Sequence, residues 1–212
     1  MSFVKHVMAA AFIASAPVAA YATTPASTFN FYQDGGSLLD QVSTSPSYVS
    51  GNLQLVVRAF DASGKQISVA SNFTGLGART SSILDSGDLN AGSLFGGAPG
   101  DYLTLTFNQT VNVTGIRLSG WSNGLLGIGA ESGSFSTGTK SFTLGSTNDG
   151  ASPLTTFALT GFSGTVFKLQ ATGKSDFRLG GLNVTAVPEP GTYALMALGL
   201  AGVGVVARRR QR

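Results

Sequence analysis

Cysteine is missing from the 212-residue sequence, and histidine occurs once, as His6. His6 lies in an N-terminal segment that we expect to be removed, so the rest of the chain offers neither a thiol nor an imidazole. This excludes a Ser-His-Asp triad, a Cys-His nucleophile pair, and zinc or copper sites built from imidazole or thiolate ligands. Without cysteine there are also no disulfides, so a hydrophobic core alone must stabilise the folded part.

Charged residues are scarce, at 11% of the sequence, and the formal net charge of +3 is carried by the two ends. Lys5 and four tail arginines account for five of the thirteen basic residues, and Glu189 is one of the ten acids. Residues 23–187 therefore hold eight basic and nine acidic residues, a net charge of about −1. A nearly neutral central region without a basic cluster argues against nucleic acid as a partner.

The N-terminus has the three parts of a signal peptide. A mildly positive start is followed by an apolar run over residues 7–18, and then by small residues, Ala20 and Ala22, at the two positions that signal peptidase reads. We therefore predict that residues 1–22 are a signal peptide, cleaved before Thr23. An uncleaved N-terminal helix is the alternative, but this apolar run is too short to span a membrane.

The C-terminus combines a proline motif, an apolar stretch and an arginine cluster. The motif is Pro188, Glu189 and Pro190, the stretch runs over residues 193–207, and the cluster comprises Arg208, Arg209, Arg210 and Arg212. The stretch would rise about 22 Å as a helix, against about 30 Å for a bilayer core, so we expect a short single transmembrane helix that holds the protein temporarily. Arginines stay cytoplasmic, which places the rest of the chain on the other side. A permanent tail anchor with a proline-rich stalk is the alternative.

Residues 187–212, with the Pro-Glu-Pro motif complete, resemble the PEP-CTERM sorting signal of Gram-negative bacteria. The resemblance implies recognition by an exosortase, a membrane protease or transpeptidase that removes the tail and releases or re-anchors the remaining chain outside. The implied partners are signal peptidase, the exosortase and, before processing, the inner membrane. Residues 75–77, 85–87 and 176–179 also resemble β-sandwich domains that precede such tails, which implies architecture but no ligand-binding residue.

Short alternations of apolar and polar residues, separated by turn-forming residues, predict an all-β domain over residues 23–186. The apolar positions of residues 111–118 continue across Gly115, which predicts a strand with a bulge or kink. Other strands are expected near residues 28–32, 53–60, 66–70, 102–107, 140–144, 154–159, 165–171 and 177–184. About nine short strands with Gly-rich turns indicate a two-sheet, jelly-roll-like β-sandwich.

Three apolar residues in the last predicted strands are expected to lie in the core: Phe167, Leu169 and Phe177. Residues 123–138 are rich in Gly, Ser and Thr and contain only scattered apolar residues, which predicts a long surface loop. We therefore expect one domain. A second domain beginning in this segment is the alternative.

The segment 85–90 contains three oxygen-bearing side chains, Asp85, Asp88 and Asn90, that could bind calcium together with backbone oxygens. The segment lacks the spacing of an EF-hand loop and its terminal Glu. Asp and Asn also favour turns because their side chains bond their own backbone. The alternatives are therefore a calcium site and a polar turn, and no other cofactor is expected.

The single tryptophan, Trp121, is flanked by turn-forming residues. An exposed indole would suit contact with carbohydrate, since a sugar ring has an apolar face and polar edges. The alternative is that Trp121 caps the core at the end of a strand.

Two functional hypotheses follow from these features. The first is a non-enzymatic surface or extracellular-matrix protein associated with exopolysaccharide and biofilm, because the chain has export and sorting signals and its central region has neither histidine nor cysteine. The second is a secreted polysaccharide hydrolase that uses paired carboxylates, which remain available. The carboxylates show no spacing that marks a pair, so we expect that the protein is not an enzyme.

Overall fold

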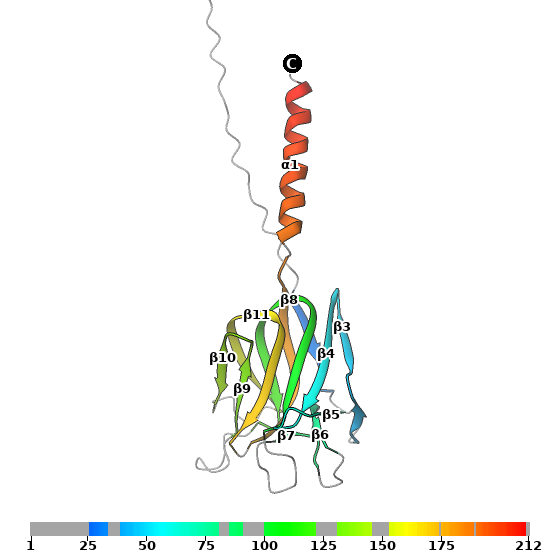
Figure 1. Ribbon diagram of the computed structural model, residues 1–212, viewed down its shortest axis with the longest axis vertical. Helices are drawn as coiled ribbons and strands as arrows, with labels where there is room; N and C mark the ends of the chain where they lie inside the picture. Colours follow the sequence, from blue (N-terminus) through cyan, green and yellow to red (C-terminus); the bar gives the residue numbers. More distant parts are fainter. Residues whose placement is uncertain are drawn as a thin grey trace, which may run out of the picture.

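The computed structural model describes residues 26–33, 39–80, 85–90, 100–121, 131–145, 153–173, 175–188 and 190–210 (Figure 1). The described strands are β1 (Ala26–Asn30), β2 (Gln41–Ser43), β3 (Ser47–Ser50), β4 (Leu53–Phe60), β5 (Gln66–Asn72), β6 (Gly75–Arg79), β7 (Leu89–Asn90), β8 (Tyr102–Ser119), β9 (Ser132–Ser136), β10 (Ser141–Leu144), β11 (Leu154–Thr172) and β12 (Asp176–Ala186). They are followed by one helix, α1 (Pro190–Arg210). The prediction of a mostly β chain is confirmed.

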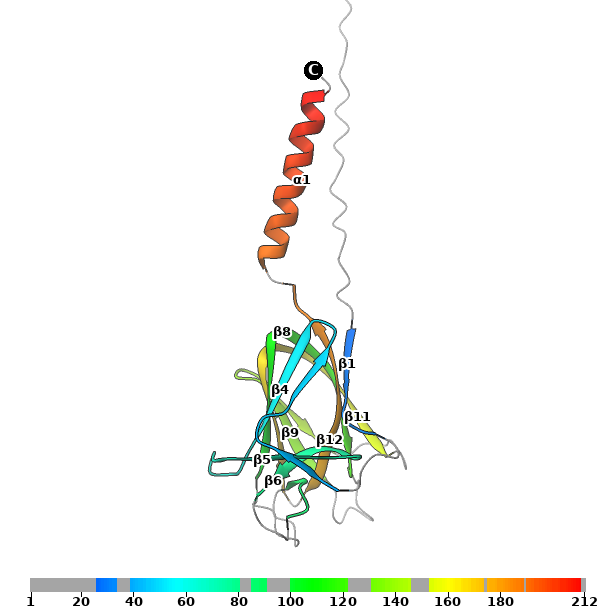
Figure 2. The same ribbon diagram turned by 90° about the vertical axis from the view of Figure 1, so that its right-hand side faces the viewer.

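The strands form one antiparallel hydrogen-bonded network in the order β1-β12-β6-β5-β4-β8-β11-β9-β10. Three short strands attach to it, with β2 on β5, β3 on β4 and β7 on β12. Because β12 pairs with β8 as well as with β6, the strands β12, β6, β5, β4 and β8 close into a ring (Figures 1 and 2).

The two separate sheets expected for a jelly-roll-like sandwich are not confirmed, because the described strands belong to one closed network. The joining strand is β12, in which Leu179 pairs with Leu76 of β6 and with Leu118 of β8. A sandwich and a closed sheet both bury one face of each strand. The alternation of apolar and polar residues is therefore the same in both, and only the strand pairing separates them.

The long strand β8 contains the kink that the sequence predicted. Its first half pairs with β4 and its second half with β12. Asn183 pairs with Gly115 and Val184 with Val113, so Thr114 is an extra residue in β8. An extra residue of this kind is a β-bulge, which bends the strand and increases its twist. Because of this bend, β8 can pair with β4 along its first half and with β12 along its second half.

Alternate residues of the strands fill one hydrophobic core. In β4 the alternating apolar residues are buried as predicted: Leu53, Leu55, Val57 and Ala59. Phe167, Leu169 and Phe177 are at most 1% exposed, which confirms their predicted positions in the core. The Phe167 ring contacts the rings of Phe107 and Phe135, with centroids 5.9 and 5.6 Å apart. Burial of each such side chain contributes roughly 1.5–3 kcal/mol.

The surface loop predicted over residues 123–138 is wrong for residues 132–136, which form β9. This strand pairs with β10 and β11 and places Phe135 in the core with no exposed surface. Gly and Ser dominate its sequence, so its alternation was too weak to read as a strand. Residues 122–130 lie outside the described residues.

The helix α1 extends away from the sheet in both views (Figures 1 and 2). Large apolar side chains on it are exposed, among them Leu198 and Val203, each at 69%. The structure corrects the expectation of a single transmembrane helix, because within the described ranges no helix is both long enough and apolar enough to cross a membrane. The physical reason is the short apolar stretch, whose rise of about 22 Å falls below a bilayer core of about 30 Å.

Candidate functional site

The proline motif follows directly on the last strand of the sheet. β12 ends at Ala186, and the backbone N–H of Val187 donates a hydrogen bond to the carbonyl oxygen of Thr110 at 2.9 Å. Pro188 has no N–H with which to extend the ladder, so the pairing stops there. The helix begins at Pro190, where the fixed φ of proline suits the first turn. The motif is therefore the connection between sheet and helix.

The motif contributes no residue to the described strand pairings. The last pair of β12 joins Ala186 to Val111 of β8. A cut after Pro188 would therefore leave every described strand in place. Arg208, Arg209 and Arg210 lie at the end of α1 that is farther from the sheet (Figure 1). The remaining predicted processing residues lie outside the described residues: Ala20, Ala22, Thr23, Glu189 and Arg212.

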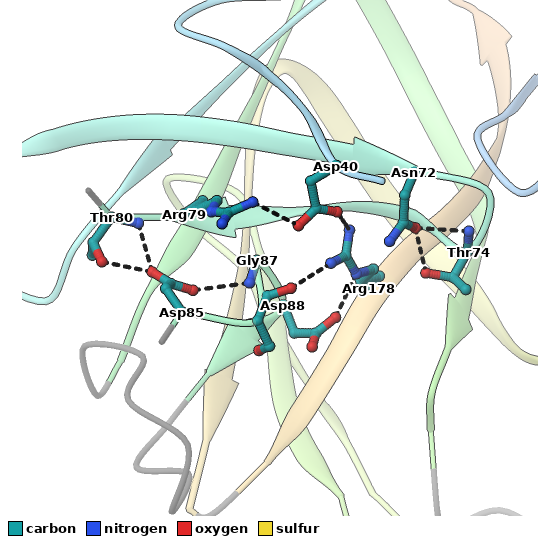
Figure 3. A network of polar contacts seen from close by, with 10 residues as sticks. Asp40, Asn72, Thr74, Arg79, Thr80, Asp85, Gly87, Asp88 and Arg178 are labelled. Carbon is teal, nitrogen blue, oxygen red and sulfur yellow. Dashed lines mark hydrogen bonds and ion pairs between the residues drawn. The ribbon is translucent and has the colours of Figure 1, made fainter. Parts of the chain in front are cut away.

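A polar network surrounds Arg178 near the start of β12, at the other end of that strand from the proline motif (Figure 3). Arg178 Nη1 lies 3.0 Å from Asp40 Oδ1, and Nη2 donates to the carbonyl oxygen of Ser86 at 2.7 Å. Arg178 Nε donates to Asp88, and Arg79 pairs with the second oxygen of Asp40 at 3.2 Å. The Arg178 side chain is only 5% exposed, so these acids compensate a charge that water does not reach.

Asp85, the first residue predicted to bind calcium, accepts hydrogen bonds from the protein on both carboxylate oxygens. Its Oδ2 accepts hydrogen bonds from the backbone N–H and the hydroxyl of Thr80, at 2.6 and 2.7 Å. Its Oδ1 accepts one from the N–H of Gly87 at 2.9 Å (Figure 3). This arrangement is that of a polar turn, in which the carboxylate satisfies the backbone of its own segment.

The other two residues predicted to bind calcium also make structural contacts. Asp88 bonds Arg178, and Asn90 is buried in β7. Over the part of the chain that the structure describes, no group of three or more His, Cys, Asp or Glu side chains is arranged to hold a metal ion. Calcium binding by Asp85, Asp88 and Asn90 stays a prediction.

Two carboxyl groups are paired beside Arg178. Burial raises the pKa of Asp176 to about 7, and the charge of Asp88, a hydrogen bond to Asp88 and the charge of Glu131 raise it further against the opposing effect of Arg178. Burial also raises the pKa of Glu131, whose Oε2 accepts a hydrogen bond from the N–H of Asp176 at 2.6 Å. Carboxyl groups that bond each other directly are closer than the roughly 5–9.5 Å that glycosidases need.

Asp101 is also a buried acid, and no cation of the described residues forms an ion pair with it. Its residue surface is 0% exposed, and neither carboxylate oxygen has a hydrogen-bond partner among the described residues. Burial, followed by the charges of Asp85 and Asp61, raises the pKa of Asp101 to about 7. An ionised carboxylate in this position costs free energy, so Asp101 makes the folded state sensitive to pH.

The sequence reasoning missed the Arg178 network. The available signal was a basic residue inside the predicted strand 177–184, where apolar residues are otherwise frequent. Such a residue requires a buried acid, but Asp40 lies far away in the sequence and no pattern identifies it as the partner.

Trp121 packs against the core. It is half-buried, and its ring centroid lies 5.0 Å from those of Phe157 and Phe177, with interplanar angles of 75° and 54°. Its Nε1 is buried without a hydrogen-bond partner in the described ranges. These contacts are those of a residue that caps the core. Carbohydrate contact by Trp121 stays a prediction.

The family model of the PEP-CTERM protein-sorting motif matches residues 186–210. This match begins at the last residue of β12 and ends at the last residue of α1, so it covers the junction and the helix. No curated protein matches the chain. The chain carries a PEP-CTERM sorting motif, which implies an exported protein that is targeted to an exosortase.

Proposed function

We propose that this chain is a non-enzymatic surface or extracellular-matrix protein that associates with exopolysaccharide in a biofilm after processing by an exosortase. The observation that carries the proposal is the sorting motif, which lies outside the closed sheet and begins where β12 ends. Removal of the tail would leave an intact all-β domain. The domain would then remain at the cell surface or in the matrix.

The side chains of the domain agree with a binding role. The chain has no cysteine and its one histidine is His6, so the rest of the chain lacks the side chains for Ser-His-Asp or Cys-His acyl transfer and for imidazole-metal chemistry. Of the two described carboxyl groups with the largest rise in pKa, Asp101 is fully buried and Asp176 is half-buried beside Asp88. Their burial favours a structural contribution over contact with a substrate.

Processing is tested by replacing the motif. In a host with an exosortase, we expect the wild-type protein to lose its tail and appear in the surface or extracellular fraction. The triple variant Pro188→Ala, Glu189→Ala, Pro190→Ala should keep α1 and be missing from the surface and extracellular fractions. Pro46→Ala, at a proline outside the motif, is the matched control. Mass spectrometry of the C-terminus and fractionation of the cells give the readout, and a wild-type surface protein with its tail intact would refute the proposal.

A secreted polysaccharide hydrolase that uses paired carboxylates is the second candidate, because Glu131 and Asp176 are neighbouring acids with raised pKa values. Incubation with the exopolysaccharide of the host separates the two functions. Retention of the protein without release of reducing ends supports the matrix role. Steady release that disappears in both Glu131→Gln and Asp176→Asn supports the hydrolase.

A further inference from the structure

A pocket of about 200 Å³ opens where the end of β1, the start of β2, β3, the end of β5 and the start of β6 meet. It contains no residue of the proline motif and none of the ion-paired residues around Arg178, and it shares only Asn72 with the polar contacts drawn in Figure 3. Its lining combines aromatic rings, hydroxyl groups and side-chain amides. The pocket thus adjoins the Arg178 network without using its ion pairs, and the composition of its lining indicates the class of ligand.

The apolar wall of the pocket is fixed by backbone hydrogen bonds. The N–H of Phe31 donates to the carbonyl oxygen of Gly180 at 3.0 Å, and the N–H of Gln33 donates to that of Phe73 at 2.8 Å. The Phe31 ring is 5% exposed and meets the Tyr48 ring edge to face, with centroids 4.9 Å apart. A wall held in this way needs no ordering when a ligand binds, which lowers the entropic cost of binding.

The polar lining is rich in amides that are free to bind. Gln33 and Gln41 are exposed, and neither side chain has a hydrogen-bond partner within the described ranges. Gln41 pairs across the strands with Ser71, which lines the same pocket. A side-chain amide both donates and accepts hydrogen bonds, as does a sugar hydroxyl, so the two groups are complementary.

Asn72 lines the same pocket with a defined orientation. Its Oδ1 accepts hydrogen bonds from the N–H and the hydroxyl of Thr74, at 2.8 and 2.6 Å. The carbonyl side of this amide is therefore engaged, and its NH₂ group is left as the donor. A fixed donor beside two adaptable glutamines can select among hydroxyl positions.

The charge and the size of the pocket limit the class of ligand that it can bind. None of the nine lining residues is Asp, Glu, Lys or Arg. A carboxylate or sulfate would therefore lose its hydration without gaining a counter-charge. Pockets for drug-sized ligands measure roughly 300–1,000 Å³, so this pocket suits a single ring.

We propose that the pocket binds one neutral sugar residue of a polysaccharide, with the apolar face of the ring against Tyr48 and Phe73 and its hydroxyls on Gln33 and Gln41. This inference rests on the proposed association with exopolysaccharide and names the part of the chain that makes the contact. Binding of one ring is weak, but repeated sugars along a polymer raise the effective concentration at the pocket.

The test is electrophoresis of the full chain through native gels that contain dextran, galactomannan or alginate. A polyoxyethylene detergent keeps the exposed helix soluble and carries no sugar headgroup. We expect a neutral polymer to retard the wild-type protein, while alginate, a polymer of uronates, does not. The double variant Gln33→Ala, Gln41→Ala should weaken this binding at least tenfold. Gln54→Ala removes an exposed glutamine that does not line the pocket and should change binding less than twofold.

The possible results decide the proposal as follows. Retardation by a neutral polymer that is lost in the double variant, with an unchanged thermal midpoint, supports it. Wild-type protein that neither neutral polymer retards, equal retardation of the double variant, or stronger retardation by alginate overturns it. Export and removal of the tail are measured separately by fractionation. A protein that is exported and processed but not retarded would therefore refute the pocket and leave processing intact.

Discussion

Arg178 on β12 and Asp40, which directly precedes β2, form an ion pair with 3.0 Å between Nη1 and Oδ1. These two atoms lack hydrogen-bond geometry. Arg178 instead donates hydrogen bonds to Asp88 and to the carbonyl oxygen of Ser86. Both side chains of the ion pair are less than 10% exposed. One guanidinium therefore connects the start of the last strand to two segments that come much earlier in the chain.

Arg178→Met should lower the free energy of unfolding by about 3–5 kcal/mol, because it leaves the nearby acids buried without their cation. Urea denaturation at pH 7 measures the change. Arg58→Met, at an exposed position on β4, is the matched control and should stay within about 0.5 kcal/mol of wild type. A loss for Arg178→Met as small as that of the control would contradict the assigned role.

Asp101→Asn should make stability less dependent on pH. The pKa of Asp101 is raised to about 7 in the folded protein, from an ordinary value of 3.8. The stability contributed by its protonation is thus complete below pH 4 and is lost as the pH rises through 7. We expect the variant to be more stable than wild type at pH 8, by roughly 1–3 kcal/mol, and to lose this advantage at pH 4.

The control for Asp101 is Asp61→Asn, measured by urea denaturation from pH 4 to pH 8 in the Asp101→Asn background, because the charge of Asp61 also raises the pKa of Asp101. The hydrogen bond from Ser63 is the main cause that lowers the pKa of Asp61, so the wild-type residue stabilises the fold above its ordinary pKa and loses this effect on acidification. The two variants should therefore shift the pH profile in opposite directions. Parallel shifts would show that the burial of Asp101 does not set its pKa.

Phe167→Asp should unfold the domain, since it places a carboxylate among the rings of Phe107 and Phe135. Val166→Asp is the matched control, because the neighbouring side chain points to the opposite face and is 47% exposed. Circular dichroism and thermal melting distinguish the two variants. A soluble Phe167→Asp protein with the wild-type midpoint would refute its place in the core.

Gly77→Ala should destabilise the protein by an amount on the order of 1–3 kcal/mol. A Cβ at this position would lie 2.0 Å from the carbonyl oxygen of Gly87, so the backbone of the turn before β7 would have to move. At Gly138 an added Cβ meets nothing within 4 Å, and Gly138→Ala is the control. Equal unfolding midpoints for the two variants would show that the close approach is not needed.

Local patterns identified the strands with a clear alternation. Residues 53–60 form β4 with the predicted face buried, and the bulge expected at Gly115 is present in β8. Alternation did not identify β9, because its buried Phe135 stands among small residues and the apolar and polar positions differ little. The pattern also predicted two strands where the structure has the single strand β11, because Gly161 and Gly164 lie between its two apolar runs.

The candidate sites divide along the same line. The proline motif is contiguous, so Pro188 and Pro190 could be recognised before the fold was known. The Arg178 network and the amide pocket collect residues from several strands, and nothing in the sequence places Gln33 and Gln41 in one pocket or Asp40 next to Arg178. Of the predicted calcium residues, Asp85 accepts hydrogen bonds from Thr80 and Gly87 on its two carboxylate oxygens. Only the three-dimensional contacts show this.

By itself the sequence determined the β character of the domain, its buried faces and the sorting motif at its end, because each depends on residues that are neighbours along the chain. The tertiary structure decided that the strands close into one ring, that Arg178 is matched by distant acids, and that four amides share a pocket. These features depend on which strands pair. Alternation specifies which face of a strand is buried, but many pairings bury that face equally well.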